Sequence, residues 1–332
     1  MNQHRQTGLT LIEIMIALGI SVAIIGTMAQ ALALTSDGYR RAQTLSAMQE
    51  QADVALRYLA SDIRMAGHWS VAGSARHIAG RSLPGDHNAA SLLLPSRCDP
   101  RFVLDLAVPV DVSNSPKHWQ CGIDAAANAD VLVLRGLGAA HATPLPPRLQ
   151  VVAAPGHGVI SDSADVPPHF VGPVQRHNLA VYGYYVATES SLFPDQPVLR
   201  RLTLSSLSSR PYVVDEEIAH GIETVRFAVL VDEDGDGYAD LTRQPQDPRL
   251  RQRDGDGAPL ATVVGVQVWL VVRSDTAGWT QEAQQTLRLG DQTYQPPTDG
   301  YLRFVTHHTA WVRNSGGLLR DTGTAAWSSC QH

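Results

Sequence analysis

A chain of 332 residues, of which 44% are hydrophobic and 17% charged, can bury a sizeable core, so no class of disordered protein fits it. The formal net charge is −6 and no basic run is longer than Arg40-Arg41, which argues against a nucleic-acid partner. The three cysteines, Cys98, Cys121 and Cys330, are too few for a disulfide scaffold and lack the paired short spacings of a zinc site.

The first feature along the chain is an apolar run from Leu9 to Leu34, in which Glu13 is the only charged residue. About 20 such residues are enough for a helix to cross the hydrocarbon core of a bilayer, so the run predicts a membrane span. A carboxylate inside such a segment costs on the order of a few kcal/mol unless it faces a partner, which makes Glu13 a candidate functional residue. The alternative is a carboxylate near the end of the span that reaches the headgroups.

The residues before this run differ from a secretory signal peptide, in which a small-residue cleavage site follows the apolar core. Here the polar residues 1–8 end in Gly8, directly before the apolar run. The order Gly8-Leu9-Thr10-Leu11-Ile12-Glu13 resembles the class III leader of type IV prepilins and of the related pseudopilins. The resemblance implies cleavage between Gly8 and Leu9 by prepilin peptidase, and N-methylation of Leu9, where most of the family has Phe. It also implies a single-pass inner-membrane protein whose C-terminal domain lies in the periplasm.

After Leu34 the pattern becomes that of an amphipathic helix. Apolar residues recur at steps of three and four, namely Leu45, Met48, Ala52, Leu56, Leu59 and Ile63. Because the first proline is Pro84, we expect one continuous helix from Leu9 to about Ala66, with Gly67 near its C-terminal end. Its first half would lie in the membrane and its second half would pack on a globular domain.

The end of this helix carries a second resemblance. The segment from Asp62 to Trp69, Asp-Ile-Arg-Met-Ala-Gly-His-Trp, resembles the junction that follows the helix in the PilW family of minor pilins. From their spacing, Arg57, Asp62 and Arg64 are predicted to be solvated helix charges with some i,i+4 pairing. The alternative role for these charges is docking to a neighbouring pilin.

The translocation that the resemblance implies would place the cysteines in an oxidising compartment. A disulfide between Cys98 and Cys121 is then chemically allowed, and it would stabilise the fold by roughly 3 kcal/mol in the chain-entropy model. Cys330 is left over, and it either pairs with one of the others or stays free.

The remainder of the chain predicts a β-rich domain. Residues 71–90 have a loop composition, and short strand candidates follow; these candidates lie at 92–94, 102–110 and 131–135. From Leu179 onward the β pattern is strongest, with alternating apolar residues. It predicts strands at 180–187, 197–204, 221–231, 262–273 and 302–313. The order of these segments, from a tyrosine-rich strand to a terminal Trp-Val-Arg-Asn, again resembles the PilW family.

These segments predict an α+β fold that is type IV pilin-like, in which a long N-terminal helix packs on an antiparallel β-rich globular domain. The expected divisions are a leader at 1–8, a transmembrane half-helix at 9–34, an amphipathic half-helix at 35–67 and a periplasmic globular domain at 68–332.

An acidic turn follows the strand at 221–231. Its alternating aspartates and its glycines are typical of a loop that wraps a hard cation with oxygen ligands. The candidate calcium ligands are Asp232, Asp234, Asp236, Tyr238 and Asp240. Position twelve holds Arg243, where an EF-hand needs a bidentate Glu.

A second acidic segment, with Asp254 and Asp256, precedes the strand at 262–273. If that strand pairs with 225–231 as an antiparallel neighbour, both acidic segments fall at the same end and could share one ion. The alternative is that the Asp-Gly pairs only form turns.

The features together predict a minor pilin that helps to prime or cap a type IV pilus. Its expected partners are other minor pilins, major pilins, prepilin peptidase and the inner-membrane assembly platform. Glu13 would neutralise the N-terminal amine of a neighbouring subunit, a charge pair that is stronger in a low-dielectric bundle than in water.

The alternatives are a minor pseudopilin of type II secretion and a calcium-dependent adhesive module. The sequence has no Gly-x-Ser-x-Gly elbow, His-Glu-x-x-His motif, P-loop or dinucleotide fingerprint, so we do not expect an enzyme.

Overall fold

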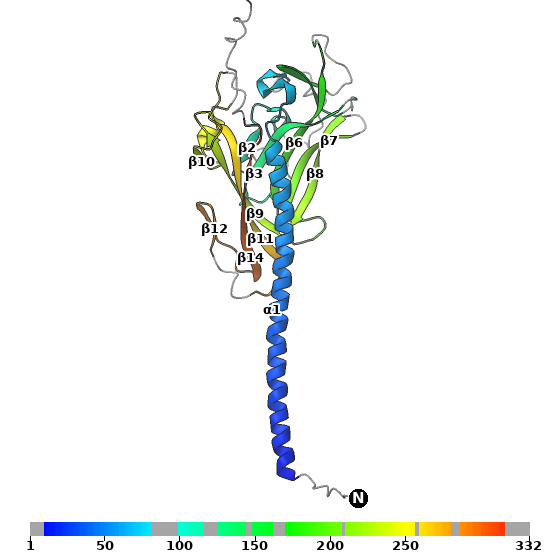
Figure 1. Ribbon diagram of the computed structural model, residues 1–332, viewed down its shortest axis with the longest axis vertical. Helices are drawn as coiled ribbons and strands as arrows, with labels where there is room; N and C mark the ends of the chain where they lie inside the picture. Colours follow the sequence, from blue (N-terminus) through cyan, green and yellow to red (C-terminus); the bar gives the residue numbers. More distant parts are fainter. Residues whose placement is uncertain are drawn as a thin grey trace, which may run out of the picture. The chain divides into compact units, whose positions relative to one another are not determined.

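The computed structural model shows one long helix and a β-rich region (Figure 1). It describes residues 10–80, 99–115, 125–141, 143, 148–161, 170, 172–207, 210–255, 259–279 and 286–315. The helices are α1 (Leu11–Met65) and α2 (Arg101–Leu104), with short 3-10 turns η1 (Ser70–Ala72), η2 (Ala75–His77) and η3 (Pro248–Arg251). The strands are β1 (Ile78–Ala79), β2 (Val110–Ser113), β3 (Val131–His141), β4 (Gln150–Ala154), β5 (His157–Ser161), β6 (Gln175–Ala187), β7 (Val198–Leu207), β8 (Arg210–His220), β9 (Ile222–Asp232), β10 (Leu241–Arg243), β11 (Thr262–Ala277), β12 (Leu287–Leu289), β13 (Gln292–Tyr294) and β14 (Tyr301–Trp311).

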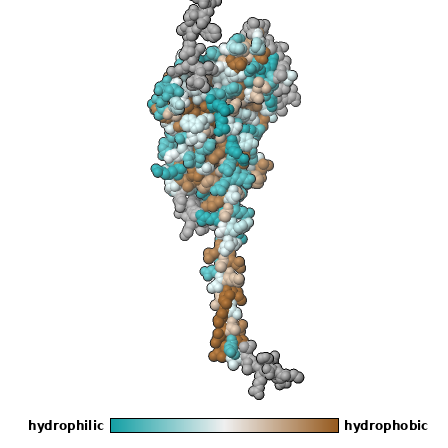
Figure 2. Space-filling model, in the orientation of Figure 1, coloured by the Kyte–Doolittle hydropathy of each residue, from teal (hydrophilic) through white to brown (hydrophobic). Residues whose placement is uncertain are grey.

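The helix α1 is continuous over 55 residues, as its proline-free sequence predicts. The chain divides into two compact units, Met1–Gln49 and Glu50–His332, so α1 contributes to both. In the first unit the large apolar side chains from Leu11 to Leu34 are 47–79% exposed, and they appear as brown atoms in Figure 2. This part of α1 is long and apolar enough to cross a membrane.

In the second unit α1 buries one face. Ala52, Ala55, Leu59 and Ile63 are at most 3% exposed, and their steps of three and four place them on one side of the helix. The helix ends at Met65, and Gly67 follows it with a φ of 72°, which only glycine adopts readily, and with an N–H that donates to the Arg135 carbonyl of β3. The buried face and this hydrogen bond attach the end of α1 to the sheet.

The strands form two larger sheets and one small hairpin. The first sheet runs β1-β5-β4-β6-β3-β2, and β7 joins it by pairing with β6 and with β8. The second runs β10-β9-β11-β14 and is antiparallel throughout, while β12 and β13 pair with each other. Apart from the parallel pair β1–β5, the first sheet is also antiparallel. The predicted fold class, a long apolar helix with an antiparallel β-rich domain, is confirmed.

The strand candidate at 102–110 is wrong. Residues 101–104 form α2, and β2 begins only at Val110. The cause is Arg135 of β3, which is fully buried and donates hydrogen bonds to the carbonyls of Arg101, Phe102 and Val108 at 2.7–3.1 Å. Carbonyls held by a guanidinium are not available to a strand ladder.

Three other sequence-based expectations have different outcomes. The candidate at 131–135 is part of β3, which continues to His141, and the candidate at 92–94 lies outside the described residues. The segment expected to be a loop at 71–90 is described as far as Gly80, and it contains η1, η2 and β1 rather than loop alone.

Candidate functional site

The N-terminus of α1 holds Glu13 in a capping box with Thr10. The Thr10 backbone N–H and hydroxyl donate to Glu13 Oε2 at 2.9 and 2.8 Å, and the Glu13 N–H lies 3.4 Å from Thr10 Oγ1. The carboxylate therefore satisfies donors at the start of its own helix. The sequence analysis singled out Glu13 but missed Thr10, although a Thr three residues before a Glu is the pattern of such a cap.

Glu13 keeps one oxygen for another partner. Its Oε2 accepts both bonds from Thr10, and within the described ranges no donor is bonded to Oε1. The side chain is exposed, so a cationic group of another chain can reach it. The predicted processing residues, Gly8 and Leu9, lie outside the described residues.

At the other end of α1, Asp62 is held by two strands. Its Oδ2 accepts a hydrogen bond from the Tyr184 hydroxyl at 2.5 Å and one from Arg201 Nη1 at 3.2 Å. Arg201 also pairs with Glu216 at 2.9 Å, and its guanidinium lies 4.9 Å from the ring centre of Tyr58 on α1. The predicted role of Asp62 as a solvated helix charge is wrong, because only 12% of its side chain is exposed.

Burial raises the pKa of Asp62, while the Tyr184 hydroxyl and the Arg201 charge lower it. A buried carboxylate without its cation is costly, so Arg201 and Asp62 stabilise each other. This network fixes α1 to β6 and β7 and gives the junction a structural role.

The segment after α1 places two histidines together. The ring of His68 meets that of His177 edge-on, at 6.3 Å between centres. The Nδ1 atom of His177 is 2.9 Å from the Gly138 carbonyl, and its Nε2 is 3.3 Å from Gln175 Oε1. Burial, followed by the neighbouring His177, lowers the pKa of His68, against a hydrogen bond with Asn314.

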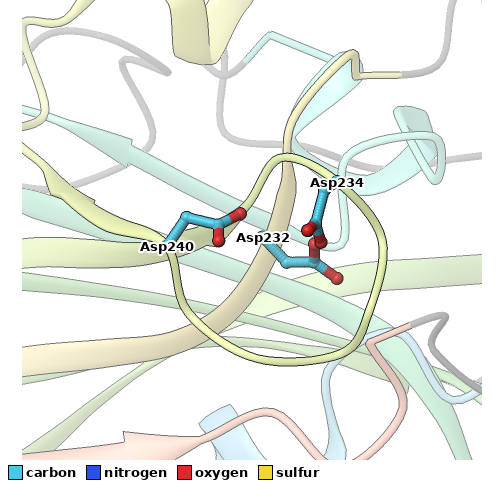
Figure 3. A group of neighbouring side chains, drawn as sticks. All are labelled: Asp232, Asp234 and Asp240. Carbon is cyan, nitrogen blue, oxygen red and sulfur yellow. The ribbon is translucent and has the colours of Figure 1, made fainter.

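The acidic turn gathers three of the five predicted ligands. Asp232, Asp234 and Asp240 each offer an oxygen, and these oxygens lie within 4.8 Å of one another (Figure 3). Asp232 is buried, and its two oxygens accept from the amides of Gly235 and Gly237. The cluster is therefore held at its base by a carboxylate that the loop backbone orients.

The other predicted ligands do not join this cluster. Asp236 Oδ1 accepts from the Tyr238 amide, and the Tyr238 side chain is 76% exposed. Asp254 forms an ion pair with Arg76 at 2.5 Å and is not among the clustered carboxylates. Asp256 lies outside the described residues.

The connection around the acidic turn also differs from the expected one. β9 and β11 are antiparallel neighbours as predicted, with Val225 opposite Leu270. The turn itself, however, joins β9 to the short strand β10, which pairs on the other side of β9. At position twelve, Arg243 is buried and forms ion pairs with Glu233 and Asp247, so Glu233 is bound to a cationic side chain rather than turned to the cluster.

Cys98, Cys121 and Cys330 all lie outside the described residues. The pairing of Cys98 with Cys121 stays a prediction.

A long apolar N-terminal helix, continuous with a helix end that packs on an antiparallel β-rich unit, defines a type IV pilin-like protein. Within this class, residues 183–314 match the family described as Type IV Pilus-assembly protein W, or PilW. The resemblance to the PilW family that the strand sequence indicated is thus confirmed over the matched part of the chain, from within β6 to the turn after β14. The leader, Glu13 and the junction at Asp62 lie before the matched residues.

One similar solved structure is a type IV-like pilin from Thermus thermophilus. It is 13% identical, the match covers 81% of this chain and 97% of that one, and the TM-score is 0.36. Among curated proteins, no sequence matches this chain.

Proposed function

We propose that this protein is a minor pilin that primes or caps a type IV pilus together with other pilins. The PilW match supports a role in type IV pilus assembly, and the apolar part of α1 supports an anchor in the cell envelope. The observation that carries the proposal is the combination of the PilW strands with an apolar helix that has one carboxylate at its start.

In this proposal prepilin peptidase cleaves between Gly8 and Leu9, and the inner-membrane assembly platform takes up the processed chain. Glu13 then pairs with the N-terminal amine of a neighbouring subunit. This pairing is favourable because a carboxylate and a protonated amine attract each other strongly where water is excluded. The available Oε1 of Glu13 can accept the amine while Oε2 keeps the capping box with Thr10.

The test replaces Glu13 with Ala or Gln in the full chain, in cells from which the wild-type chain has been deleted. We expect both variants to insert into the membrane and to produce far fewer pili, measured by electron microscopy and by shear fractions. Thr10→Val breaks the hydroxyl bond of the capping box but keeps the carboxylate, so it should retain piliation. Glu50→Ala, an exposed change on the same helix, should also retain it.

Normal piliation with Glu13→Ala would contradict the intersubunit pair. Normal piliation in the deletion strain would contradict the role in the pilus altogether. Normal piliation combined with lost protein secretion would indicate the pseudopilin of type II secretion instead.

We further propose that the acidic turn binds calcium through Asp232, Asp234 and Asp240. Three carboxylate oxygens that converge within 4.8 Å suit a hard cation that prefers oxygen ligands. In an adhesive role for the domain, such an ion would order the turn.

Isothermal titration of the fragment Glu50–His332 with calcium tests this proposal. We expect binding by the parent, loss of binding in Asp234→Ala and retained binding in Asp236→Ala, because Asp236 lies outside the cluster. Asp254→Ala is a control on the second acidic segment. A parent fragment that gives neither heat nor a calcium-dependent rise in melting temperature would rule out the site.

A further inference from the structure

The strand β14 is an edge strand, because one of its two sides has no ladder partner among the described strands. It is 11 residues long and its ladder partner in the described residues is β11 alone. The register along this pair is unbroken from Gly265 opposite Trp311 to Arg273 opposite Arg303. An edge of this kind presents unpaired backbone groups to any chain that can add a strand.

The hydrogen bonds at the two ends of β14 show which amides face outward. The Val312 N–H donates to the Val264 carbonyl at 2.9 Å, and the Leu302 N–H donates to Ser274 Oγ at 3.0 Å. Even-numbered residues therefore point toward β11, and because an antiparallel ladder alternates, odd-numbered residues point away from it. The Arg313 N–H confirms the alternation, since it donates outward to the Arg64 carbonyl of α1 at 3.1 Å.

Four successive outward residues remain available, namely Val305, His307, Thr309 and Trp311. Among the residues that the structure describes, none is bonded to their amides. Outward groups two residues apart along a strand recur roughly every 6.8 Å, which matches the spacing of an added strand. The free edge therefore begins at Trp311, next to the Arg313–Arg64 hydrogen bond, and extends along β14 to Val305.

This edge lacks the features that usually prevent strand addition. From Phe304 to Trp311 it has no Pro, Lys, Arg, Asp or Glu, and Trp311 is 56% exposed. The opposite edge of the same sheet, β10, is only 3 residues long. The long edge strand of the other sheet, β8, carries Pro211 and the acidic residues 215–217. Proline, charge and shortness protect those edges, whereas β14 is long and its residues 304–311 carry neither proline nor a Lys, Arg, Asp or Glu.

We propose that the free edge of β14 takes up an uncharged, extended β-strand of a different pilin subunit anchored in the same membrane. The proposal rests on the assembly role given above. The exposed, uncharged segment fits a strand without charged side chains, because a charge placed against it would lose solvent without gaining a partner. Anchoring in one membrane raises the effective concentration of the two strands.

A second copy of this chain fits less well. In the unit Glu50–His332, β14 and the end of α1 run toward the same end (Figure 1), because the Arg313 N–H, just after β14, donates to the Arg64 carbonyl in the last turn of α1. If two copies paired through their β14 edges by two-fold symmetry, the two strands would be antiparallel and the two α1 helices would point in opposite directions. Two copies anchored with the same polarity in one membrane have helices that point in the same direction, so they cannot pair in this way.

The experiment places a photoreactive benzophenone amino acid at position 307 of the full chain, in cells that produce their own major and minor pilins. We expect a light-dependent adduct that mass spectrometry maps to a strand of another pilin. The same residue at position 238, which is also exposed and lies on the acidic turn, is the control position. Thr309→Pro removes an outward N–H without removing a bond to β11, and should reduce the adduct several-fold, whereas Thr309→Val keeps the N–H and the adduct.

If Thr309→Pro fails to fold, a second pair of variants, His307→Lys and His307→Gln, tests the proposal. Their effect is measured by pilus counts. We expect the lysine to reduce piliation and the glutamine to preserve it. An adduct with a second copy of this chain, no pilin adduct, or wild-type piliation with both Thr309→Pro and His307→Lys would overturn the proposal. If deletion of the chain still abolishes pili, these results would overturn only the strand addition and would leave the proposed role in pilus assembly unchanged.

Discussion

At the scale of single residues, His68 gives the folded unit a dependence on pH. Burial and the neighbouring His177 lower the pKa of His68, so the folded state binds a proton there less readily than the unfolded chain does. The stability that a neutral His68 provides is present above its ordinary pKa of about 6.5 and is lost as the pH falls through that value and then through the lower folded one.

We therefore expect the melting temperature of the fragment Glu50–His332 to fall as the pH is lowered below about 6.5. His68→Gln cannot take up this proton, so its melting temperature should change less over the same range. His308→Gln, at an exposed position of β14, should keep the slope of the parent. Circular dichroism melts in a series of buffers measure all three, and equal slopes for the parent and His68→Gln would contradict the prediction.

At the scale of elements, Gly136 allows β3 to pass directly against the end of α1. A Cβ atom at this position would lie 2.8 Å from the backbone oxygen of Met65, which cannot move without shifting the helix end. Gly136→Ala is expected to destabilise the fragment by about 1–3 kcal/mol, as overpacking does in well-packed cores. Gly138→Ala on the same strand is the matched control, because its nearest neighbour would be at an ordinary 3.6 Å. Urea unfolding measures both, and equal midpoints would show that the helix end yields freely.

The elements that the sequence predicts well are those whose signal is local. The proline-free apolar pattern predicts α1, and strict alternation predicts β9 and β11 together with their pairing. The capping box was also readable, since Thr10 and Glu13 are three residues apart. Local periodicity and spacing are sufficient for such features.

Features that depend on distant residues were not predictable in this way. Asp62 looks like a solvated helix charge until Arg201, 139 residues away, is placed against it. The helix α2 replaces a predicted strand because Arg135 binds its carbonyls across 33 residues or more. In the acidic turn, the alternating sequence makes Asp234 and Asp236 look equivalent. In the folded hairpin between β9 and β10, Asp234 joins the carboxylate cluster, whereas Asp236 accepts a hydrogen bond from the Tyr238 amide.

At the scale of the whole molecule, the two units differ in what they bury. In Met1–Gln49 the large apolar side chains from Leu11 to Leu34 remain 47–79% exposed, which is unfavourable in water and favourable in hydrocarbon. In Glu50–His332 one face of α1, with Ala52, Ala55, Leu59 and Ile63, is buried together with apolar side chains of the strands. The first unit therefore needs a membrane or a bundle of like helices, and the second has its own core.

We expect the fragment Glu50–His332 to be soluble and folded without detergent, and the full chain to sediment with membranes. The full chain with Glu13→Ala should also sediment with membranes, because one carboxylate contributes little to the burial of so many apolar side chains. Produced in a strain that lacks the full chain, the exported fragment should not restore pili, since it lacks the helix that we propose brings the subunits together. Fractionation and pilus counts measure these outcomes. A full chain that stays in the aqueous fraction would contradict the anchor, and pili restored by the fragment would show that assembly relies on the β-rich unit alone.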